Sequence, residues 1–508
     1  MLDVLIVGSG PTGLTLALWL TKQGINVRIV DKSAGPGETS RAMAVQARTL
    51  ELYRQLDLAE AVISAGHKNP AVNMWARGKR KAHISFGDAG SNITPYPFVL
   101  VYPQDKHERL LEEHLRSLGV TVERETEFLS FEDRGDLVVA RLRMPDDTEQ
   151  VCEARYLAGC DGARSPIRHQ LGTEFDGGTY KQIFYVADVE VTGLEPAGEV
   201  HIVLDKEDFI LLMSYGEGNL YRLIGTVKDE RAERVEALTF DDVKHDAILG
   251  LGIQIAKVNW FSTYRVHHRV AADFRSGRAF LLGDAAHVHS PVGGQGMNTG
   301  INDAINLAWK LTAVIRGQAS DGLLDSYALE RQAFARKLVA TTDRLFTFVT
   351  TEGNFADFVK TRIAPTFVSI AYRIDSVREF MFRLISQTTI DYHGSPLSEG
   401  EAASTRGGDR LPWVRTESSD NYASLSPIEW QIHVYGAVSP DIKSWCAQHD
   451  MLLHVFEWTE SHYNAGLAQN AVYLLRPDTY VALVDDAAST ETLDRYFSSR
   501  NFNLNKTL

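Results

Sequence analysis

The amino terminus carries the feature that most constrains the fold, a glycine-rich turn between a short apolar strand and a helix. Residues 2–7 (LDVLIV) predict a buried strand, and residues 8–13 (GSGPTG) match the pattern GxGxxG. A helical pattern continues over 14–23, and a second strand over 26–30 is followed by Asp31. This order of strand, glycine turn, helix, strand and acid is the context that a dinucleotide-binding fingerprint requires. The sequence therefore predicts a Rossmann-type α/β unit.

Each part of this turn has its own physical reason. Gly8 permits the tight turn, Gly10 lets a pyrophosphate approach the start of the helix, and Gly13 lets the helix pack against the sheet. Asp31 is expected to hydrogen-bond a ribose hydroxyl. The fingerprint alone leaves open whether the dinucleotide is NAD or FAD, and a glycine-rich turn in some other α/β unit is the alternative.

Composition and charge narrow the class of protein. The chain has 508 residues, 44% hydrophobic and 23% charged, which is ordinary for a globular protein of two or three domains. The net charge of −14 argues against nucleic acid or an anionic membrane as a partner. No window of about 18 apolar residues predicts a membrane span. Three scattered cysteines without a CxxC pair favour a reducing cytoplasm as the location.

Later segments add polar residues in ordered positions. Arg41 lies in a loop that leads into an amphipathic helix, and Gln104 begins another helix. One apolar strand leads to Asp161 and Gly162, and another, over 279–282, leads to Gly283 and Asp284. An isolated arginine, glutamine or Asp-Gly pair usually lies in a surface turn. The order of these residues along the chain is what makes them informative.

That order resembles the group A flavoprotein monooxygenases, the FAD-dependent aromatic hydroxylases. Their pattern is an amino-terminal GxGxxG, a central DG motif (here Asp161-Gly162) and a late GD motif (here Gly283-Asp284), and the resemblance covers about residues 1–340. It implies that Asp284 binds the flavin ribityl chain, that the DG segment serves the pyrophosphate and the passing nicotinamide, and that Arg41 and Gln104 line the FAD site. The predicted FAD-binding residues are Gly8, Gly10, Pro11, Thr12, Gly13, Asp31, Lys32, Arg41, Gln104, Asp161, Gly283, Asp284, Pro291, Gly296, Met297 and Asn298.

The glycine-rich loop after the GD motif suits a flat ring. Residues 291–296 (PVGGQG) bring backbone close to a ligand without side chains in the way. The helix that begins near Met297 and Asn298 is expected to point its positive end at the flavin pyrimidine edge, where negative charge collects on reduction. His287 and His289 flank this loop and are interpreted as loop scaffolding, because two ligands without a third make a poor metal site. No metal is predicted.

The resemblance also implies a mechanism. NADH or NADPH visits briefly and delivers hydride to FAD, oxygen adds at flavin C4a, and the hydroperoxide passes an oxygen atom to a small aromatic substrate, phenolic or polycyclic. The sequence has no second GxGxxG, which argues against a permanent NAD(P) domain. Two alternatives are a flavin-dependent halogenase, whose WxWxIP signature is missing here, and a FAD-binding protein without turnover.

The middle region is expected to select the substrate. Its apolar stretches predict an antiparallel sheet over 176–275, with Phe209, Leu211, Met213 and Tyr215 on one face of a strand. A phenolic substrate needs a nearby proton acceptor. His201, Tyr215 and Tyr221 are candidates, but none is assigned, so the catalytic residue is unknown.

The remaining chain divides by composition. Residues 395–410 are polar, glycine-rich and linker-like, and 411–508 alternate strands and helices in a way that resembles the thioredoxin-like tail of phenol and polyketide hydroxylases. Thioredoxin chemistry is not expected, because Cys446 stands alone there. The tail is therefore assigned a packing role or the support of a homodimer. The predicted domains are FAD-binding (1–175 and 276–340), substrate (176–275), helical connection (341–394), linker (395–410) and thioredoxin-like (411–508).

Overall fold

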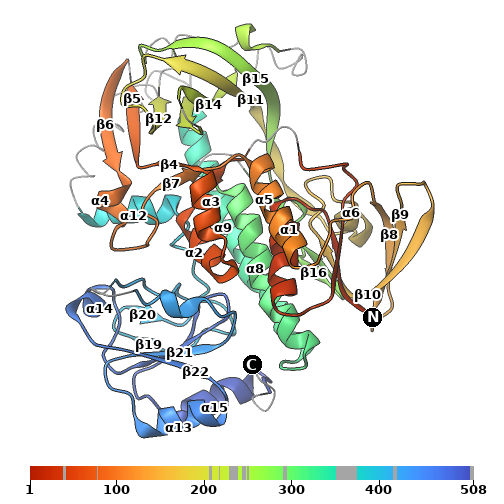
Figure 1. Ribbon diagram of the computed structural model, residues 1–508, viewed down its shortest axis with the longest axis vertical. Helices are drawn as coiled ribbons and strands as arrows, with labels where there is room; N and C mark the ends of the chain where they lie inside the picture. The colour runs from red at the N-terminus through yellow and green to blue at the C-terminus, as the bar shows by residue number, and fades with distance from the viewer. Residues whose placement is uncertain are drawn as a thin grey trace.

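A computed structural model gives the fold of most of the chain (Figure 1). It describes residues 1–37, 42–76, 78–204, 209–216, 218–227, 238–242, 248, 251–289, 294–350, 375–415 and 420–503. The predicted α/β class is confirmed. A parallel sheet with helices around it carries the amino-terminal fingerprint, and a second, largely antiparallel sheet lies above it in Figure 1.

The first sheet has the strand order β16-β17-β10-β1-β2 among the described residues. Four neighbouring strands run parallel: β17 (Ala279–Leu281), β10 (Glu149–Gly159), β1 (Leu2–Val7) and β2 (Val27–Val30). The antiparallel strand β16 (Arg275–Ser276) lies at one edge. The antiparallel pair β9 (Val138–Arg143) and β8 (Glu127–Asp133) joins the sheet through the first part of β10. Because the central strands are parallel, their carboxyl ends meet at one edge. All the strand-ending motifs identified in the sequence lie at that edge.

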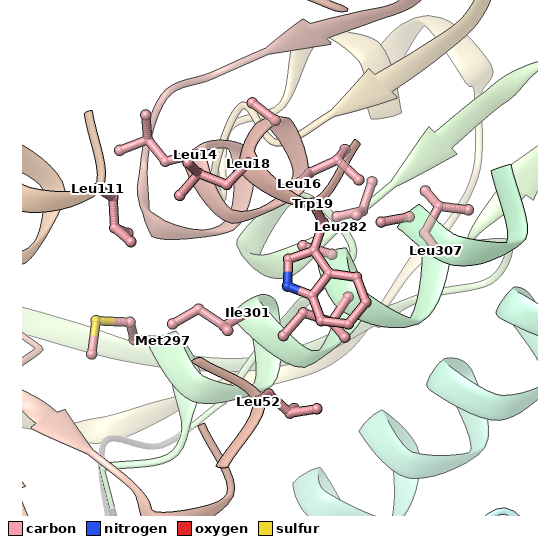
Figure 2. Close-up of a cluster of buried hydrophobic side chains, with 14 of the residues drawn as sticks. Leu14, Leu16, Leu18, Trp19, Leu52, Leu111, Leu282, Met297, Ile301 and Leu307 are labelled. Atoms are coloured by element: carbon pink, nitrogen blue, oxygen red, sulfur yellow. The ribbon is translucent and has the colours of Figure 1, made fainter. Parts of the chain in front are cut away.

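Helix α1 (Pro11–Lys22) starts three residues before the helix expected from residue 14. Pro11 occupies its first turn, where the fixed proline φ suits a helix and the missing N–H costs nothing. Gly24, at φ +71°, follows its end. Figure 2 shows how α1 packs on α8 (Gly296–Ile315): the Trp19 ring lies between the two helices near Ile301, and both side chains belong to one buried cluster. This core fixes the two helix starts relative to each other.

The second sheet has the order β18-β15-β11-β14-β13-β12-β5-β6. Its strands are β5 (Ala71–Ala76), β6 (Lys79–Ser85), β11 (Phe175–Thr192), β12 (Val200–Leu204), β13 (Phe209–Ser214), β14 (Leu220–Val227), β15 (Gln254–Ala271) and β18 (His287–Val288). The antiparallel strands expected in the middle region are confirmed. The sheet also takes in β5 and β6, since β5 pairs in parallel with β12. The predicted substrate range, 176–275, therefore leaves out three strands of this sheet, namely β5, β6 and β18.

The two faces of this sheet bury different side chains. Leu211, Met213 and Tyr215 of the β13 region pack on the core of the flavin domain. Ile210 and Tyr221 belong to a separate core on the outer face. The side chain of Phe209 lies outside the described residues. The face predicted from the sequence is thus the inner one, a point that periodicity alone left undecided.

The carboxyl-terminal region forms a four-stranded sheet of order β22-β21-β23-β24 among the described residues. Its elements are β21 (Gln431–Tyr435), α13 (Pro440–Gln448), β22 (Leu452–Phe456), α14 (Glu460–Asn464), β23 (Val472–Leu475), β24 (Val481–Asp485) and α15 (Thr490–Ser499). Segment 395–410, expected to be linker-like, packs against this sheet through the hairpin β19 (Glu401–Ala402) and β20 (Thr405–Arg406). Leu397 and Arg410 in it are buried, so its polar composition conceals a packed segment.

The remaining elements complete the architecture of the described residues. They are β3 (Ala44–Val45), α2 (Ala47–Tyr53), η1 (Arg54–Leu56), α3 (Ala59–Ala65), β4 (His67–Asn69), α4 (Phe86–Gly90), β7 (Val99–Val101), α5 (Gln104–Ser117), α6 (Pro166–Leu171), η3 (Phe240–Asp242), η4 (Gly283–Ala285), η5 (Asp321–Leu324), α9 (Asp325–Thr350), α12 (Asp375–Ile385) and η7 (Ala423–Leu425). Among the helices that the structure describes, none is long and apolar enough to cross a membrane.

Candidate flavin site

Backbone hydrogen bonds join the motif segments where the parallel strands end. The amide of Gly8 donates to Val30 O (2.9 Å), and the amide of Cys160 donates to Val7 O (2.8 Å). The amide of Leu282 donates to Gly159 O (3.0 Å). The GxGxxG, DG and GD segments and the strand before Asp31 therefore form one continuous edge, which is where ligands bind in open α/β sheets.

The three fingerprint glycines have different surroundings. A Cβ atom at Gly8, whose φ is +101°, would lie 2.2 Å from Cys160 O, and one at Gly13 would lie 1.9 Å from Gly8 O. A Cβ atom at Gly10 would meet no heavy atom of the described residues within 4 Å. Gly8 and Gly13 are thus required by the fold itself. Gly10 instead faces open space at the start of α1, where N–H groups and the helix dipole favour an anion such as a pyrophosphate.

The GD turn packs directly on the start of α1. A Cβ atom at Gly283 would lie 2.7 Å from Thr12 Oγ1, and one at Gly300 would lie 2.3 Å from the same oxygen. Thr12 is therefore held between η4 and α8. Gly300 has the same requirement as the fingerprint glycines, but sequence reasoning missed it because it lies inside a helix, outside any turn pattern.

Asp31 reaches back to the glycine turn. Its Oδ2 accepts from the Ser9 amide (2.7 Å) and from Ser9 Oγ (2.9 Å), and its Oδ1 accepts from the Ser33 amide (2.8 Å). Arg124 Nη1 donates to Ser9 Oγ (2.7 Å), a contact that sequence reasoning did not anticipate. The neighbouring Lys32 is exposed. The acid thus lies beside the turn, as the fingerprint requires.

Asp284 is exposed although Gly283 and Ala285 on either side of it are buried. Asp303 of α8 fixes the turn: its Oδ2 accepts from the Gly283 amide (3.0 Å) and from His287 Nε2 (2.7 Å). Burial alone would raise the pKa of Asp303, but Arg331 and His287 outweigh burial and lower it. The carboxylate is therefore ionised, and His287 acts as the scaffold that its position suggested. Asp303 itself was not predicted.

Gln104 and Asn298 both hold the segment that follows Arg41. The backbone amide of Gln104 donates to the backbone carbonyl of Ala42 (3.2 Å). Asn298 Oδ1 accepts from the backbone amide of Gln46 (2.9 Å) and from the Thr49 hydroxyl Oγ1 (2.8 Å). Both residues therefore position this strand–helix segment through contacts with its backbone and side chains.

The remaining predicted site residues have varied surroundings. Gly296 and Met297 begin α8, with Met297 buried in the flavin-domain core. Asp161 Oδ2 accepts from the Ile167 amide (3.2 Å) at the start of α6, and burial raises the pKa of Asp161. Two predicted residues, Arg41 and Pro291, lie outside the described residues.

Two of the three candidate bases, His201 and Tyr221, lie on the outer face of the second sheet. His201 is buried beside Trp75, whose Nε1 donates to His201 Nδ1 (3.1 Å), and burial lowers the pKa of His201 to about 4. The Tyr221 hydroxyl accepts from the Gly198 amide (3.2 Å). Both side chains belong to the outer face, so neither faces the core of the flavin domain.

Tyr215 remains on the inner face, beside a buried ion pair. Arg222 donates to both carboxylate oxygens of Asp188 (2.7 and 2.8 Å), and its guanidinium lies 5.5 Å from the Trp260 ring centroid. Burial, with Asp188 next, raises the pKa of Tyr215 to about 12, so its phenol stays protonated at neutral pH. It is therefore a better hydrogen-bond donor than base.

Known proteins share both the sequence and the fold. The family model "FAD binding domain" matches residues 1–342. The 6-methylpretetramide 4-monooxygenase of Streptomyces rimosus is 35% identical over 416 residues, which cover 80% of this chain and 72% of that protein. The structure of anhydrotetracycline hydroxylase from Streptomyces rimosus covers 98% of this chain and 99% of its own at 27% identity, with a TM-score of 0.77.

A third comparison is a ternary complex of aklavinone-11 hydroxylase with FAD and aklavinone. It is 25% identical, covers 100% of this chain and 99% of its own, and has a TM-score of 0.77. The family match spans more than half of the chain, and it includes all the motif segments at the parallel-strand edge. The chain therefore belongs to the group A flavoprotein monooxygenases, FAD-dependent aromatic hydroxylases.

Proposed function

We propose that this protein uses NAD(P)H and O₂ to hydroxylate a polycyclic phenolic substrate. The observation that carries the proposal is the meeting of GxGxxG, Asp31, DG and GD segments at one sheet edge. The polycyclic class is supported by relatives and neighbours whose names specify pretetramide, anhydrotetracycline and aklavinone. Bound FAD would supply the redox chemistry, accepting electrons from the nicotinamide and activating oxygen.

The chain would hold FAD with the residues described above. Gly10 and the start of α1 would face the pyrophosphate, and Asp31 a ribose hydroxyl. Asp284 would bind the ribityl chain. The start of α8, from Gly296 to Asn298, would place positive helix-dipole charge at the flavin ring. Open space at Gly10 and an exposed acid between buried neighbours fit such a ligand.

The substrate would lie against the inner face of the second sheet. Leu211, Met213 and Tyr215 offer an apolar wall with one hydroxyl, a composition that suits a flat, mostly apolar ring system. Tyr215 would orient the substrate by donating a hydrogen bond. The proton acceptor for a phenol is not assigned.

Turnover with a panel of aromatic compounds tests the function. Purified protein is expected to be yellow, NADH or NADPH to bleach it anaerobically, and a polycyclic phenol to accelerate the bleaching at least tenfold over simple phenols. Mass spectrometry should then find product heavier by one oxygen atom. A yellow protein that no aromatic compound accelerates would favour the non-catalytic FAD binder, and a chlorinated product formed with chloride would favour the halogenase.

Replacing Asp284 with alanine tests the FAD placement. Asp284 is exposed, so Asp284→Ala should shift the thermal unfolding midpoint only slightly. Loss of a carboxylate bonded to ribityl hydroxyls should raise the Kd for FAD by about tenfold, from the roughly 1.5 kcal/mol of a charged hydrogen bond. Titration of apoprotein with FAD, followed by flavin fluorescence, measures this. An unchanged Kd would show that the GD motif does not contact the cofactor.

The carboxyl-terminal region is proposed to be a thioredoxin-like domain with a packing role. Its strand order, with β21 parallel to β22 and antiparallel to β23, supports that assignment. Cys446 is buried and unpaired, which suits neither dithiol chemistry nor a disulfide. A homodimer supported by this domain and a cytoplasmic location, consistent with free thiols at Cys152, Cys160 and Cys446, complete the proposal.

A further inference from the structure

A buried chain of hydrogen bonds leads away from the GD turn. The Gly283 amide donates to Asp303 Oδ2 (3.0 Å), and Arg331 Nε donates to Asp303 Oδ1 (2.6 Å). Arg331 Nη1 then donates to the Tyr392 hydroxyl (2.9 Å). Asp303 and Arg331 are 0% exposed and Tyr392 is 4% exposed, so water cannot replace these contacts. Each bond in the chain therefore restricts where the next group can lie.

Asp303 holds both ends of the turn with one carboxylate. Besides the Gly283 amide, its Oδ2 accepts from His287 Nε2 (2.7 Å), four residues further along the chain. A buried carboxylate is stable only where cations and donors surround it. Arg331 supplies the cation and also donates from Nη2 to Thr299 O (3.2 Å) in α8. The guanidinium thus sets the position of the carboxylate, and the carboxylate sets the position of the turn.

The far end of the chain rests on the carboxyl-terminal domain. The Tyr392 ring lies 4.4 Å from the Tyr480 ring, centroid to centroid, and 5.1 Å from the Arg476 guanidinium. Arg476 is itself fixed by Glu330, whose Oε1 accepts from Nη1 at 2.7 Å. Glu330 precedes Arg331 in α9, so the same helix carries both contacts. The series of hydrogen bonds that begins at Gly283 therefore ends in contacts with the carboxyl-terminal domain.

We propose that Asp303, Arg331 and Tyr392 are positioning residues for the flavin-binding turn, and that the carboxyl-terminal domain acts as their outer support. The proposal rests on the proposed contact of Asp284 with FAD. It gives this domain a role in cofactor binding without any contact to the cofactor. Nothing in this role needs redox chemistry, which agrees with the unpaired Cys446.

Two tyrosine-to-phenylalanine variants form a matched test. Tyr392→Phe removes the acceptor for Arg331, whereas Tyr496→Phe removes an equally buried hydroxyl that donates to Leu397 O (2.7 Å) within the carboxyl-terminal region. Both variants should lower the thermal unfolding midpoint by similar amounts. Tyr392→Phe should raise the Kd for FAD by about fivefold, the size expected for one buried hydrogen bond, and Tyr496→Phe should leave it within twofold.

Arg331→Lys adds an independent measurement. Lysine keeps a positive charge opposite Asp303 but cannot donate to Tyr392 and Thr299 as well. Its Kd for FAD should rise at least as much as that of Tyr392→Phe, and the double variant should bind no more weakly than Arg331→Lys alone, because the shared bond is already lost.

The outcomes separate the inference from the proposed site. Wild-type affinity in Tyr392→Phe, equal losses in the two tyrosine variants, or additive losses in the double variant would each overturn the positioning chain. If Asp284→Ala binds FAD normally, the placement of the cofactor is wrong instead. Apoprotein titrations with FAD supply every comparison without any substrate.

Discussion

Gly10→Ala is expected to weaken FAD binding by about 100-fold, or about 2.7 kcal/mol, while the apoprotein keeps its stability. The backbone at Gly10 has φ −70° and ψ −178°, which alanine adopts without strain, and the new methyl group would enter open space. That space is where the pyrophosphate is proposed to lie. Calorimetric titration of apoprotein with FAD and a thermal unfolding curve measure the two effects separately.

Gly8→Ala serves as the contrasting variant. Its methyl group would collide with Cys160 O at a backbone φ of +101°, so the unfolding free energy should fall by about 2–5 kcal/mol. The two glycines lie two residues apart in one motif, yet one variant should lose the cofactor and the other the fold. If Gly10→Ala binds FAD as tightly as the wild type, the pyrophosphate does not lie at the start of α1.

Glu330→Gln is expected to destabilise the protein by about 3–5 kcal/mol, since it leaves the buried Lys310 without its carboxylate partner and Arg476 with Asp478 alone. Glu330 accepts from Arg476 and from Lys310 Nζ (2.7 Å), and both cations are completely buried. Burial opposes ionisation of Glu330, but Arg476 and Lys310 outweigh it and hold its pKa well below the ordinary value. The urea midpoint of unfolding, followed by circular dichroism, measures the loss.

A surface pair provides the control for Glu330. Glu127 bonds Arg143 at 2.7 Å, but both side chains are nearly half exposed. Glu127→Gln should therefore change the unfolding free energy by less than about 1 kcal/mol. Equal effects of the two substitutions would mean that the interface between α9 and the carboxyl-terminal domain is hydrated, contrary to the burial described here.

The sequence was most informative where the chemistry is local. Strand, glycine turn, helix and acid occur within the first residues of the chain, so their spacing predicted the Rossmann unit directly. The sequence predicted that Phe209, Leu211, Met213 and Tyr215 share one face of their strand. It did not predict whether that face points toward the flavin domain. A single strand alternates between two faces, and only its neighbours decide which of them meets the core.

Buried polar partners were beyond reach of the sequence. Asn302, Asn306 and Lys310 recur every four residues in α8, a pattern that normally marks a solvent-facing stripe. In the structure these side chains are buried, and Asn306 and Lys310 both donate to Glu330 of α9. These polar side chains can be buried because Glu330, on a different helix, accepts their hydrogen bonds. Nothing in the local sequence of α8 indicates that pairing.

Segment 395–410 illustrates the same limit. Ser395 donates to Glu330 (2.6 Å), and Arg410 donates to both carboxylate oxygens of Glu51 (2.6 and 2.9 Å). Each of these residues looks like part of a solvated linker when its partner is unknown. Ser395 can be buried because its partner Glu330 lies on α9, and Arg410 because its partner Glu51 lies on α2. Glu51 precedes Arg410 by hundreds of residues in the sequence.

The parallel pairing of β5 with β12 has a consequence for engineering. Apart from the two-residue strand β18, the sheet proposed to select the substrate is built from two stretches of chain, residues 71–85 and 175–271, with much of the cofactor fold between them. In a chimera that takes only the longer stretch from a relative, β12 of one parent would have to pair with β5 of the other. Transfer of ring preference between such enzymes should therefore require four crossover points rather than two.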